Sequence, residues 1–240
     1  GLSSVRFAYM ENWVLAASAI VLAGILDGLD GRIARLLNAQ SRFGAELDSL
    51  SDVIAFGVSP ALVMFFWSTQ YMPQFGWVLA LTMAVGCALR LARFNALIDD
   101  EDQPHKSAGF LTGIPAPVGA GLAMLPLYLW LITDQEIFRH YALVSPWIVI
   151  IAFLMISNTA TYSWSSLRLR KNIRLEGIAV IGLLGVALIS APWIMLTAIS
   201  IAYLLMIPFS VRSYAKVKRQ RAAERSERWR VASGCVFTVR

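Results

Sequence analysis

The sequence predicts an all-α fold, a polytopic bundle of helices in a membrane. Only 15% of the residues are charged, whereas a soluble domain has about a quarter, and the mean hydropathy is +0.62. Apolar runs of about twenty residues recur along the chain, and this length crosses the hydrocarbon core of a bilayer. A soluble protein with an unusually large core is the alternative, and the repeated runs disfavour it.

The expected spans follow these apolar runs in chain order. They cover residues 13–37, 43–68, 75–98, 110–132, 141–162, 175–190 and 192–210. The last two come from one run that is too long for a single crossing, and Pro192 is the natural break because proline interrupts helical hydrogen bonding. We therefore expect seven helices in the sequence. The opening GLSSVRFAYM reads as the end of a further N-terminal helix that is truncated.

Basic residues predict the orientation of the spans. The net charge is +6, and nine of the 21 Lys and Arg residues lie after Val211. Most of the others fall in alternate short loops, as expected for topology signals beside anionic lipid rather than for nucleic-acid binding. We expect a transmembrane domain over 1–211 and a basic tail over 212–240, with the tail and the acidic stretch 26–52 on the cytoplasmic side. The two cysteines and two histidines are too scattered for a disulfide framework or a zinc site.

The acidic stretch, LDGLDGRIARLLNAQSRFGAELDSLSD, is exceptional in so apolar a chain. If residues 24–37 are helical, Asp27 and Asp30 share a face with the positions i+4, i+7 and i+8, namely Gly31, Ala34 and Arg35. In the next helix Asp48 and Asp52 share a face with Gly44. A turn near residues 38–41 makes the two helices antiparallel neighbours, so four carboxylates should converge, while Glu46 lies off this face.

Four carboxylates this close cannot all stay ionised without compensation. Protonation is one solution, and a divalent metal is the more economical one. Oxygen ligands without Cys or His favour Mg²⁺ or Mn²⁺. The sequence therefore predicts a metal site near the cytoplasmic boundary.

Small and basic residues on the same two faces suit a large polar ligand. Gly31, Ala34 and Gly44 leave the helix surfaces bare, so a ligand can approach the backbone; close packing of the helices is the alternative. Intramembrane acids favour the ligand, because such acids are costly and usually functional. Arg35 suits a phosphate oxygen, or else it is a positively charged anchor on the cytoplasmic side.

These residues form a specific pattern. Residues 27–52 read D-x2-D-G-x2-A-R-x8-G-x3-D-x3-D, which resembles the signature of the CDP-alcohol phosphatidyltransferases, helical membrane enzymes of phospholipid synthesis. Members of this family move a phosphatidyl or related group from a CDP-linked donor to an alcohol and release CMP. The resemblance also makes a homodimer and a bacterial cytoplasmic membrane reasonable expectations.

The resemblance implies a role for each matched residue. Asp27, Asp30 and Asp48 would hold two divalent metals, with Asp52 completing the site and acting as the general base on the acceptor hydroxyl. Gly31, Arg35 and Ser41 match positions that contact the CDP part of the donor. With Ala34 and Gly44, they form the expected CDP-diacylglycerol site. A metal clamp on pyrophosphate and a carboxylate base for a hydroxyl are chemically consistent with this assignment.

The acceptor is indicated by other segments. LRLARFN at 89–95 and GFLTGIPAP at 109–117 are similar to segments of the bacterial phosphatidylserine synthase branch, although Ile114 and Ala116 depart from the usual Leu and Ser. SNTATYSWSSLRLRKN at 157–172 lies where that branch has a Ser-Asn segment ending in basic residues. L-serine would be the acceptor, and its carboxylate needs a cation; Arg90, Arg93 and Asn95 are the candidates. Either arginine can equally be a topology anchor.

Other functions stay open on the sequence alone. Another member of the family would use glycerol phosphate, choline or inositol phosphate as the acceptor. A cation transporter would use its intramembrane acids as an ion path, but here the acids cluster at one membrane face. A purely structural scaffold gives no account of the four aligned aspartates.

Overall fold

The computed structural model of the chain describes residues 1–37, 41–72, 74–96, 110–157, 160–162, 185–188 and 190–209, without the side chains of 34, 35, 42, 110–112 and 160–162. Its longer elements are α1 (Leu2–Tyr9), α2 (Trp13–Leu36), α3 (Arg42–Asp52), η1 (Val53–Val58), α4 (Ser59–Trp67), α5 (Gly76–Ala96), α6 (Ala116–Ala123), α7 (Leu125–Thr133) and α8 (Tyr141–Ile156). Short elements are η2 (Thr69–Tyr71), η4 (Glu136–Arg139), β1 (Phe110–Thr112) and β2 (Ala160–Tyr162), and a further helix covers Pro192–Phe209.

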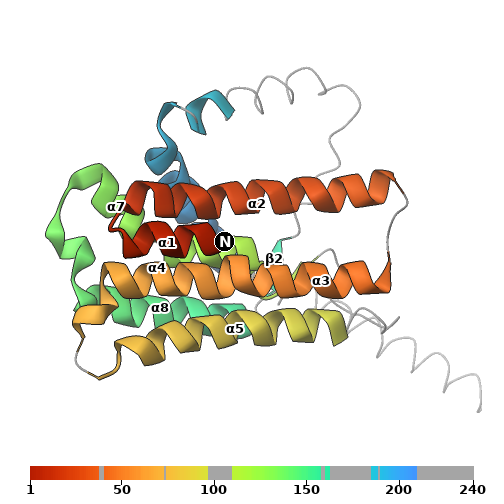
Figure 1. Ribbon diagram of the computed structural model, residues 1–240, viewed down its shortest axis with the longest axis horizontal. Coiled ribbons are helices and arrows are strands. Elements are labelled where there is room, and N and C mark those ends of the chain that lie inside the picture. The colour runs from red at the N-terminus through yellow and green to blue at the C-terminus, as the bar shows by residue number, and fades with distance from the viewer. Residues whose placement is uncertain are drawn as a thin grey trace, which may run out of the picture.

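These elements form a helical bundle, which confirms the predicted fold class. α2, the α3–α4 run and α5 lie lengthwise side by side, and α1 lies between α2 and α4 (Figure 1). α5 and α8 pack closely at Gly86, where an added Cβ would lie 3.5 Å from the carbonyl oxygen of Ala152. Small residues allow such approaches between membrane helices.

Several helices are suited to a membrane. Four described helical segments are long and apolar enough to cross one, and a fifth span is possible if the bent pair α6–α7 counts as one. These match five of the seven predicted spans. α8, with 16 residues, is shorter than the roughly twenty that a span needs. The predicted span 175–190 lies mostly outside the described residues, and the following helix begins at Pro192, as predicted.

The predicted span 110–132 is corrected in two ways. Helix starts only at Ala116, after Pro115, and the axis bends by 42° between α6 and α7. Pro126 explains the bend because it has no N–H to donate to the carbonyl of Leu122. That oxygen instead accepts a hydrogen bond of 2.9 Å from the indole Nε1 of Trp147.

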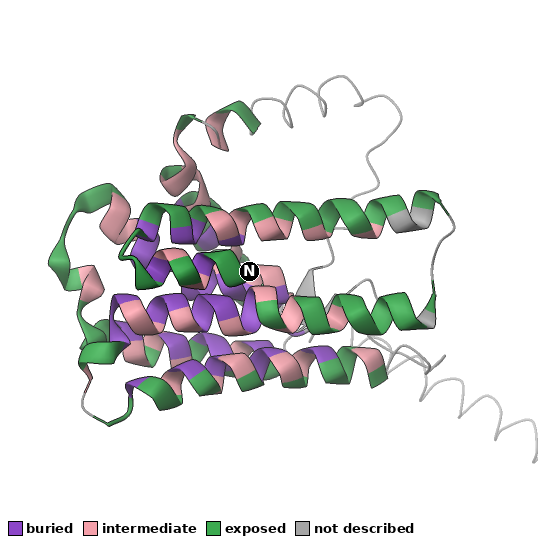
Figure 2. Cartoon of the chain, viewed as in Figure 1, coloured by how far each residue is buried: buried purple, intermediate pink, exposed green. Residues whose placement is uncertain are grey.

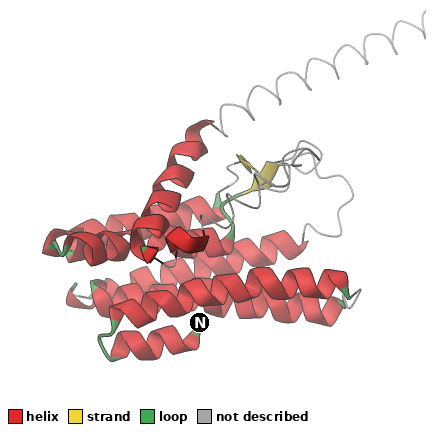
Figure 3. Ribbon diagram, turned by 90° about the horizontal axis from the view of Figure 1, so that it is seen from above, coloured by secondary structure: helices red, strands yellow, loops and turns green. Residues whose placement is uncertain are grey.

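A small antiparallel sheet corrects the predictions for the spans 110–132 and 141–162, because each of these predicted helices contains one of its strands. β1 pairs with β2, with Phe110 opposite Tyr162 and Thr112 opposite Ala160. The pair lies to one side of the helices (Figure 3). Gly113 ends β1 with φ of +76°, and a Cβ there would lie 3.0 Å from the carbonyl oxygen of Met155. Only glycine fits this turn against the end of α8.

The buried core occupies one part of the bundle. It extends over α1, α4, the first half of α2 and the inner faces of α5 to α8. The second half of α2 and all of α3 project beyond it and are largely exposed (Figure 2). The aspartates lie on these projecting segments.

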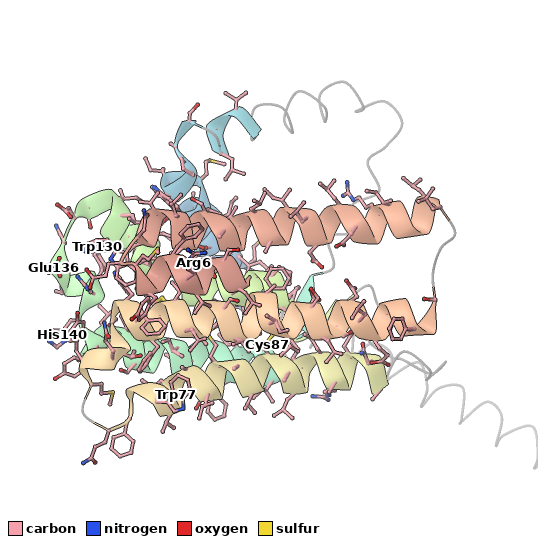
Figure 4. All side chains as sticks on the ribbon, viewed as in Figure 1. Arg6, Trp77, Cys87, Trp130, Glu136 and His140 are labelled. Atoms are coloured by element: carbon pink, nitrogen blue, oxygen red, sulfur yellow. The ribbon has the colours of Figure 1, made fainter. Side chains whose placement is uncertain are left out.

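The opposite end of the bundle is closed by Arg139. Its Nε donates to the carbonyl oxygen of Trp67 at 2.9 Å, and its guanidinium lies 5.8 to 6.0 Å from three aromatic rings, those of Trp13, Tyr71 and Trp130. Trp130 also donates from Nε1 to Glu136 (Figure 4). Cation–π contacts and a backbone acceptor therefore compensate this cation.

Candidate active site

Two neighbouring helices bring the aspartates together. α2 and α3 run side by side (Figure 1), and each turns its acidic residues toward the other. One carboxylate oxygen from each of Asp27, Asp30 and Asp48 lies within 4.8 Å of the other two. Three residues from two helices therefore form one cluster of oxygen atoms, as the helical spacing leads one to expect.

Asp52 lies at the edge of this cluster. It is the last residue of α3, and its carboxyl group is within hydrogen-bonding reach of that of Asp27. It is partly buried, whereas Asp30 and Asp48 are exposed. Asp27 is partly buried as well, so Asp27 and Asp52 form the inner part of the cluster, and Asp30 and Asp48 form its exposed mouth.

A π-helical segment follows Asp52 directly. In η1 the helix widens, and the N–H of Ser59 donates to the carbonyl of Ile54, five residues earlier. Buried Phe56 and Gly57 lie in this segment, and Gly57 packs against Cys87 of α5. π-segments inside α-helices are often found at functional sites. The sequence reasoning missed η1, because the apolar run 43–68 looks like one regular helix.

Asp27, Asp30 and Asp48 have no ion-paired cation among the described side chains. The side chain of Arg35, proposed to bind phosphate, lies outside the described part, as does that of Ala34. Carboxylates this close repel one another unless a proton or a cation lies between them. Three converging hard oxygen ligands suit a divalent cation such as Mg²⁺ or Mn²⁺.

The small residues behave differently from one another. At Gly31 an added Cβ would meet no described atom within 4 Å. Gly31 therefore does not serve close packing against any described residue, which removes the alternative explanation for this glycine. At Gly44 the Cβ would lie 3.0 Å from Oγ of Ser41. Ser41 caps α3, and its Oγ accepts a hydrogen bond of 2.9 Å from the N–H of Gly44.

The three residues of α5 that were predicted to bind serine differ in burial and in their contacts. Arg90 points inward: its Nε is buried without a hydrogen-bond partner among the described residues, and its charge interacts with Asp52. Arg93 is exposed. Asn95 turns toward α3, where its Nδ2 donates to Oγ of Ser49 at 2.9 Å.

Two residues near the cluster were not anticipated. Ser49, between Asp48 and Asp52, bonds to Asn95; a hydroxyl in an acidic helix gives no signal of this in the sequence. Tyr203, on the helix Pro192–Phe209, interacts electrostatically with Arg90. A tyrosine in an apolar span is a sequence signal for a polar contact. The sequence could not identify Arg90 as the partner, because it lies more than a hundred residues away in the chain.

Comparison with known proteins gives consistent matches. The family profile described as CDP-alcohol phosphatidyltransferase matches residues 2–162, and the profile described as CDP-alcohol phosphatidyltransferase 2 matches residues 172–208. A Mycobacterium tuberculosis protein named CDP-diacylglycerol–serine O-phosphatidyltransferase is 38% identical over 239 residues, which cover 95% of this chain and 83% of that protein.

Other organisms have relatives with the same name. The Helicobacter pylori protein is 38% identical over 164 residues, which cover 66% of this chain and 65% of the relative. The Methanocaldococcus jannaschii protein is 36% identical over 141 residues, which cover 59% of this chain and 60% of the relative. The resemblance therefore reaches from bacteria to an archaeon.

Proposed function

Because the chain belongs to the CDP-alcohol phosphatidyltransferase family, we propose that it transfers the phosphatidyl group of CDP-diacylglycerol to the hydroxyl of L-serine. The products are phosphatidylserine and CMP. The relatives named for this reaction support serine as the acceptor. The observation that carries the chemistry is the cluster of Asp27, Asp30 and Asp48, whose carboxylate oxygens lie within 4.8 Å of one another.

In this proposal the aspartates hold two divalent cations, Mg²⁺ or Mn²⁺. Asp27, Asp30 and Asp48 are the main ligands and Asp52 completes the set. The converging oxygens, with no cation paired to them among the described side chains, fit such ions. When bound, the ions neutralise the charge of the donor pyrophosphate and of the departing CMP.

Asp52 is proposed as the general base. A serine hydroxyl is a weak nucleophile at neutral pH, so a carboxylate that takes its proton speeds the attack. The serine oxygen then bonds to the phosphorus that bears the diacylglycerol, the pyrophosphate P–O bond breaks, and CMP leaves with the electron pair. Asp52 is more buried than Asp30 and Asp48 and directly precedes the packed segment η1, which supports this role because a sheltered site keeps water from competing with the serine hydroxyl.

The donor is proposed to bind along the open face of α2 and the start of α3. Gly31, Ala34, Arg35, Ser41 and Gly44 are the candidates. The empty space at Gly31 supports close approach of the CDP group to the α2 backbone. Ser41 and Gly44 already bond to each other, so their contribution is to hold the first turn of α3 beside the donor.

Arg90 is the proposed partner of the serine carboxylate. A buried Nε–H without a hydrogen-bond partner among the described residues is costly, and an anion beside it would remove that cost. Its interaction with Asp52 also brings the bound carboxylate near the base that acts on the hydroxyl of the same small molecule. Arg93 is exposed and has less support, and a direct role for Asn95 stays a prediction.

The placement of the protein in the cell is also proposed. The apolar helices and the family make it an integral membrane protein. The proposal adds the bacterial cytoplasmic membrane, an active site at its cytoplasmic face, a catalytic domain over 1–211, a basic tail over 212–240 and a possible homodimer. Labelling with a membrane-impermeant maleimide tests the orientation: Gln74→Cys should react in intact cells, and Glu46→Cys should react only after lysis.

The decisive experiment measures CMP release by the purified protein with CDP-diacylglycerol, a divalent metal and one alcohol at a time. Release that depends on L-serine supports the proposal, and release with glycerol phosphate, choline or inositol phosphate instead refutes the acceptor. Asp52→Asn should lower kcat by about 10²–10⁴-fold while CDP-diacylglycerol still binds. Glu46→Gln, an exposed change off the acidic face, is the control and should retain activity. Metal flux without CMP release would instead indicate a transporter.

A further inference from the structure

α3 bears two of the four aspartates but has little to hold it in place. Its described side chains are exposed except for Ser49 and Asp52, and it packs chiefly against η1, which continues it. Toward α2 it presents carboxylates that face other carboxylates. Without a cation this interface pushes the two helices apart. Something on the other side of α3 has to fix its position.

Asn95 provides that contact. Its Nδ2 donates to Oγ of Ser49 at 2.9 Å, and Ser49 in turn donates to the carbonyl oxygen of Ala45 at 3.1 Å. Ser49 lies next to Asp48 and three residues before Asp52, so the bond acts on the turn that bears both. Apart from the contact between Asp52 and Asp27 of α2, the Ser49–Asn95 pair is the one hydrogen-bonded side-chain link from α3 to another helix in the described part of the chain.

The direction of the contact matters as much as its presence. Figure 1 shows α3 between α2 on one side and α5 on the other. Helical spacing turns Ser49 about 100° away from Asp48. A hydrogen bond to α5 at Ser49 therefore fixes the rotation of α3 about its axis, and this rotation decides whether Asp48 faces α2.

We propose that Asn95 is a positioning residue that acts through Ser49, orienting Asp48 and Asp52 toward the aspartates of α2. It does not touch the serine substrate in this role. The inference rests on the proposed metal site and deepens the proposed function. Partners that orient metal ligands in this way typically change metal affinity by about 10–100-fold when they are removed.

The test titrates the purified full-length protein with Mn²⁺ in the absence of both substrates and follows free Mn²⁺ by electron paramagnetic resonance. Asn95→Ala and Ser49→Ala should each raise the Mn²⁺ dissociation constant about tenfold. The double variant should be no worse than either single one, because both remove the same bond. Ser49→Thr keeps the hydroxyl and should bind Mn²⁺ normally. Ser18→Ala is the matched control, because it removes an exposed hydroxyl on α2 that, like that of Ser49, donates to the carbonyl four residues earlier.

Steady-state kinetics separates this role from direct substrate binding. Asn95→Ala should lower kcat at fixed low metal and leave the KM for serine within about twofold of wild type. A raised serine KM with unchanged Mn²⁺ affinity, or additive effects of the two single changes, would overturn the inference. A wild-type protein that binds no Mn²⁺ overturns both the inference and the metal site. A protein that binds Mn²⁺ but releases no CMP with serine overturns only the acceptor, and the titration alone then decides the role of Asn95.

Discussion

Gly31 and Arg90 are two residues of the proposed site whose surroundings differ from what is usual for their residue types. Both lie on long apolar helices, where a glycine usually serves packing and an arginine usually anchors the helix end. In the structure an added Cβ at Gly31 meets no described atom within 4 Å, and the buried Nε of Arg90 has no described hydrogen-bond partner. Each is therefore better explained by a ligand than by the fold.

The first prediction concerns Gly31→Ala. The added methyl group meets no described atom, so the protein should fold, with a gain in helix stability of about 0.5–1 kcal/mol. The KM for CDP-diacylglycerol should nevertheless rise, because the methyl group occupies space proposed for the donor. Melting curves and donor-dependent kinetics measure the two effects. Gly121→Ala, on α6 and outside the two acidic helices, also meets no described atom within 4 Å and is the control; equal kinetics for both variants would contradict the donor assignment.

The second prediction concerns Arg90→Ala. Loss of a charge-assisted hydrogen bond costs about 1.5–3 kcal/mol, so the KM for serine should rise about 10–100-fold while the KM for the donor stays the same. Arg90→Lys should recover part of the loss, because a point charge replaces a planar fork. Arg6→Ala, at an exposed arginine of α1, is the control (Figure 4). An unchanged serine KM in Arg90→Ala would exclude this residue as the carboxylate partner.

Among the secondary-structure elements, the proposed site depends on the junction between the α-helix α3 and the π-helix η1. α3 is exposed and acidic, η1 is π-helical and packed, and α4 is buried in the core. A π-turn adds a residue to the turn, so it changes which side chains face inward on either side of it. η1 thereby links the orientation of Asp52 to the packing of Phe56 and Gly57.

The third prediction concerns Gly57→Ala in η1. A Cβ there would lie 2.9 Å from Cβ of Cys87, so η1 and α5 must separate. The change should cost about 1–3 kcal/mol of stability and lower the thermal midpoint in detergent. It should also reduce kcat by moving Asp52. Gly121→Ala, in α6, meets no atom within 4 Å and should be tolerated. If Gly57→Ala melts and turns over like wild type, η1 does not couple packing to the site.

At the scale of the whole molecule, the two ends of the bundle have separate tasks. The end formed by α2 and α3 is open, exposed and acidic. The opposite end is closed, and Arg139 joins four elements there through Trp13, Trp67, Tyr71 and Trp130. Buried packing is thus concentrated away from the acidic end, which leaves the end that we propose as the active site free to bind and release substrates.

The fourth prediction tests this division. Arg139→Ala removes one hydrogen bond and three cation–π contacts, so it should destabilise the protein by about 2–4 kcal/mol. The KM values for both substrates should stay the same, because the change lies at the far end. The stability of Arg139→Lys should lie between those of the wild type and Arg139→Ala, since lysine keeps the charge and loses the planar fork. The control is Asp134→Asn at the same end of the bundle. This change should leave the stability unaltered, because asparagine tolerates the φ of 54° at this position. Altered substrate affinity in Arg139→Ala would show that the ends are coupled.

The sequence by itself determined the membrane bundle, the pairing of the acidic helices and the family. These features are local: apolar length defines a span, and a 3.6-residue period places Asp27 with Asp30 and Asp48 with Asp52. The errors were local as well, since the runs 110–132 and 141–162 are apolar enough for unbroken helices although they contain strands and a proline bend.

The burial and the partners of the individual candidate residues are known only from the tertiary structure. It separated Arg90 from Arg93, gave Asn95 the hydroxyl of Ser49 as a partner, and left the space at Gly31 open. Ser49 and Asn95 are 46 positions apart, and no periodicity within one helix reports on the rotation of another helix against it. The physical reason is that helical spacing fixes which residues share a face, while packing between helices fixes what that face meets.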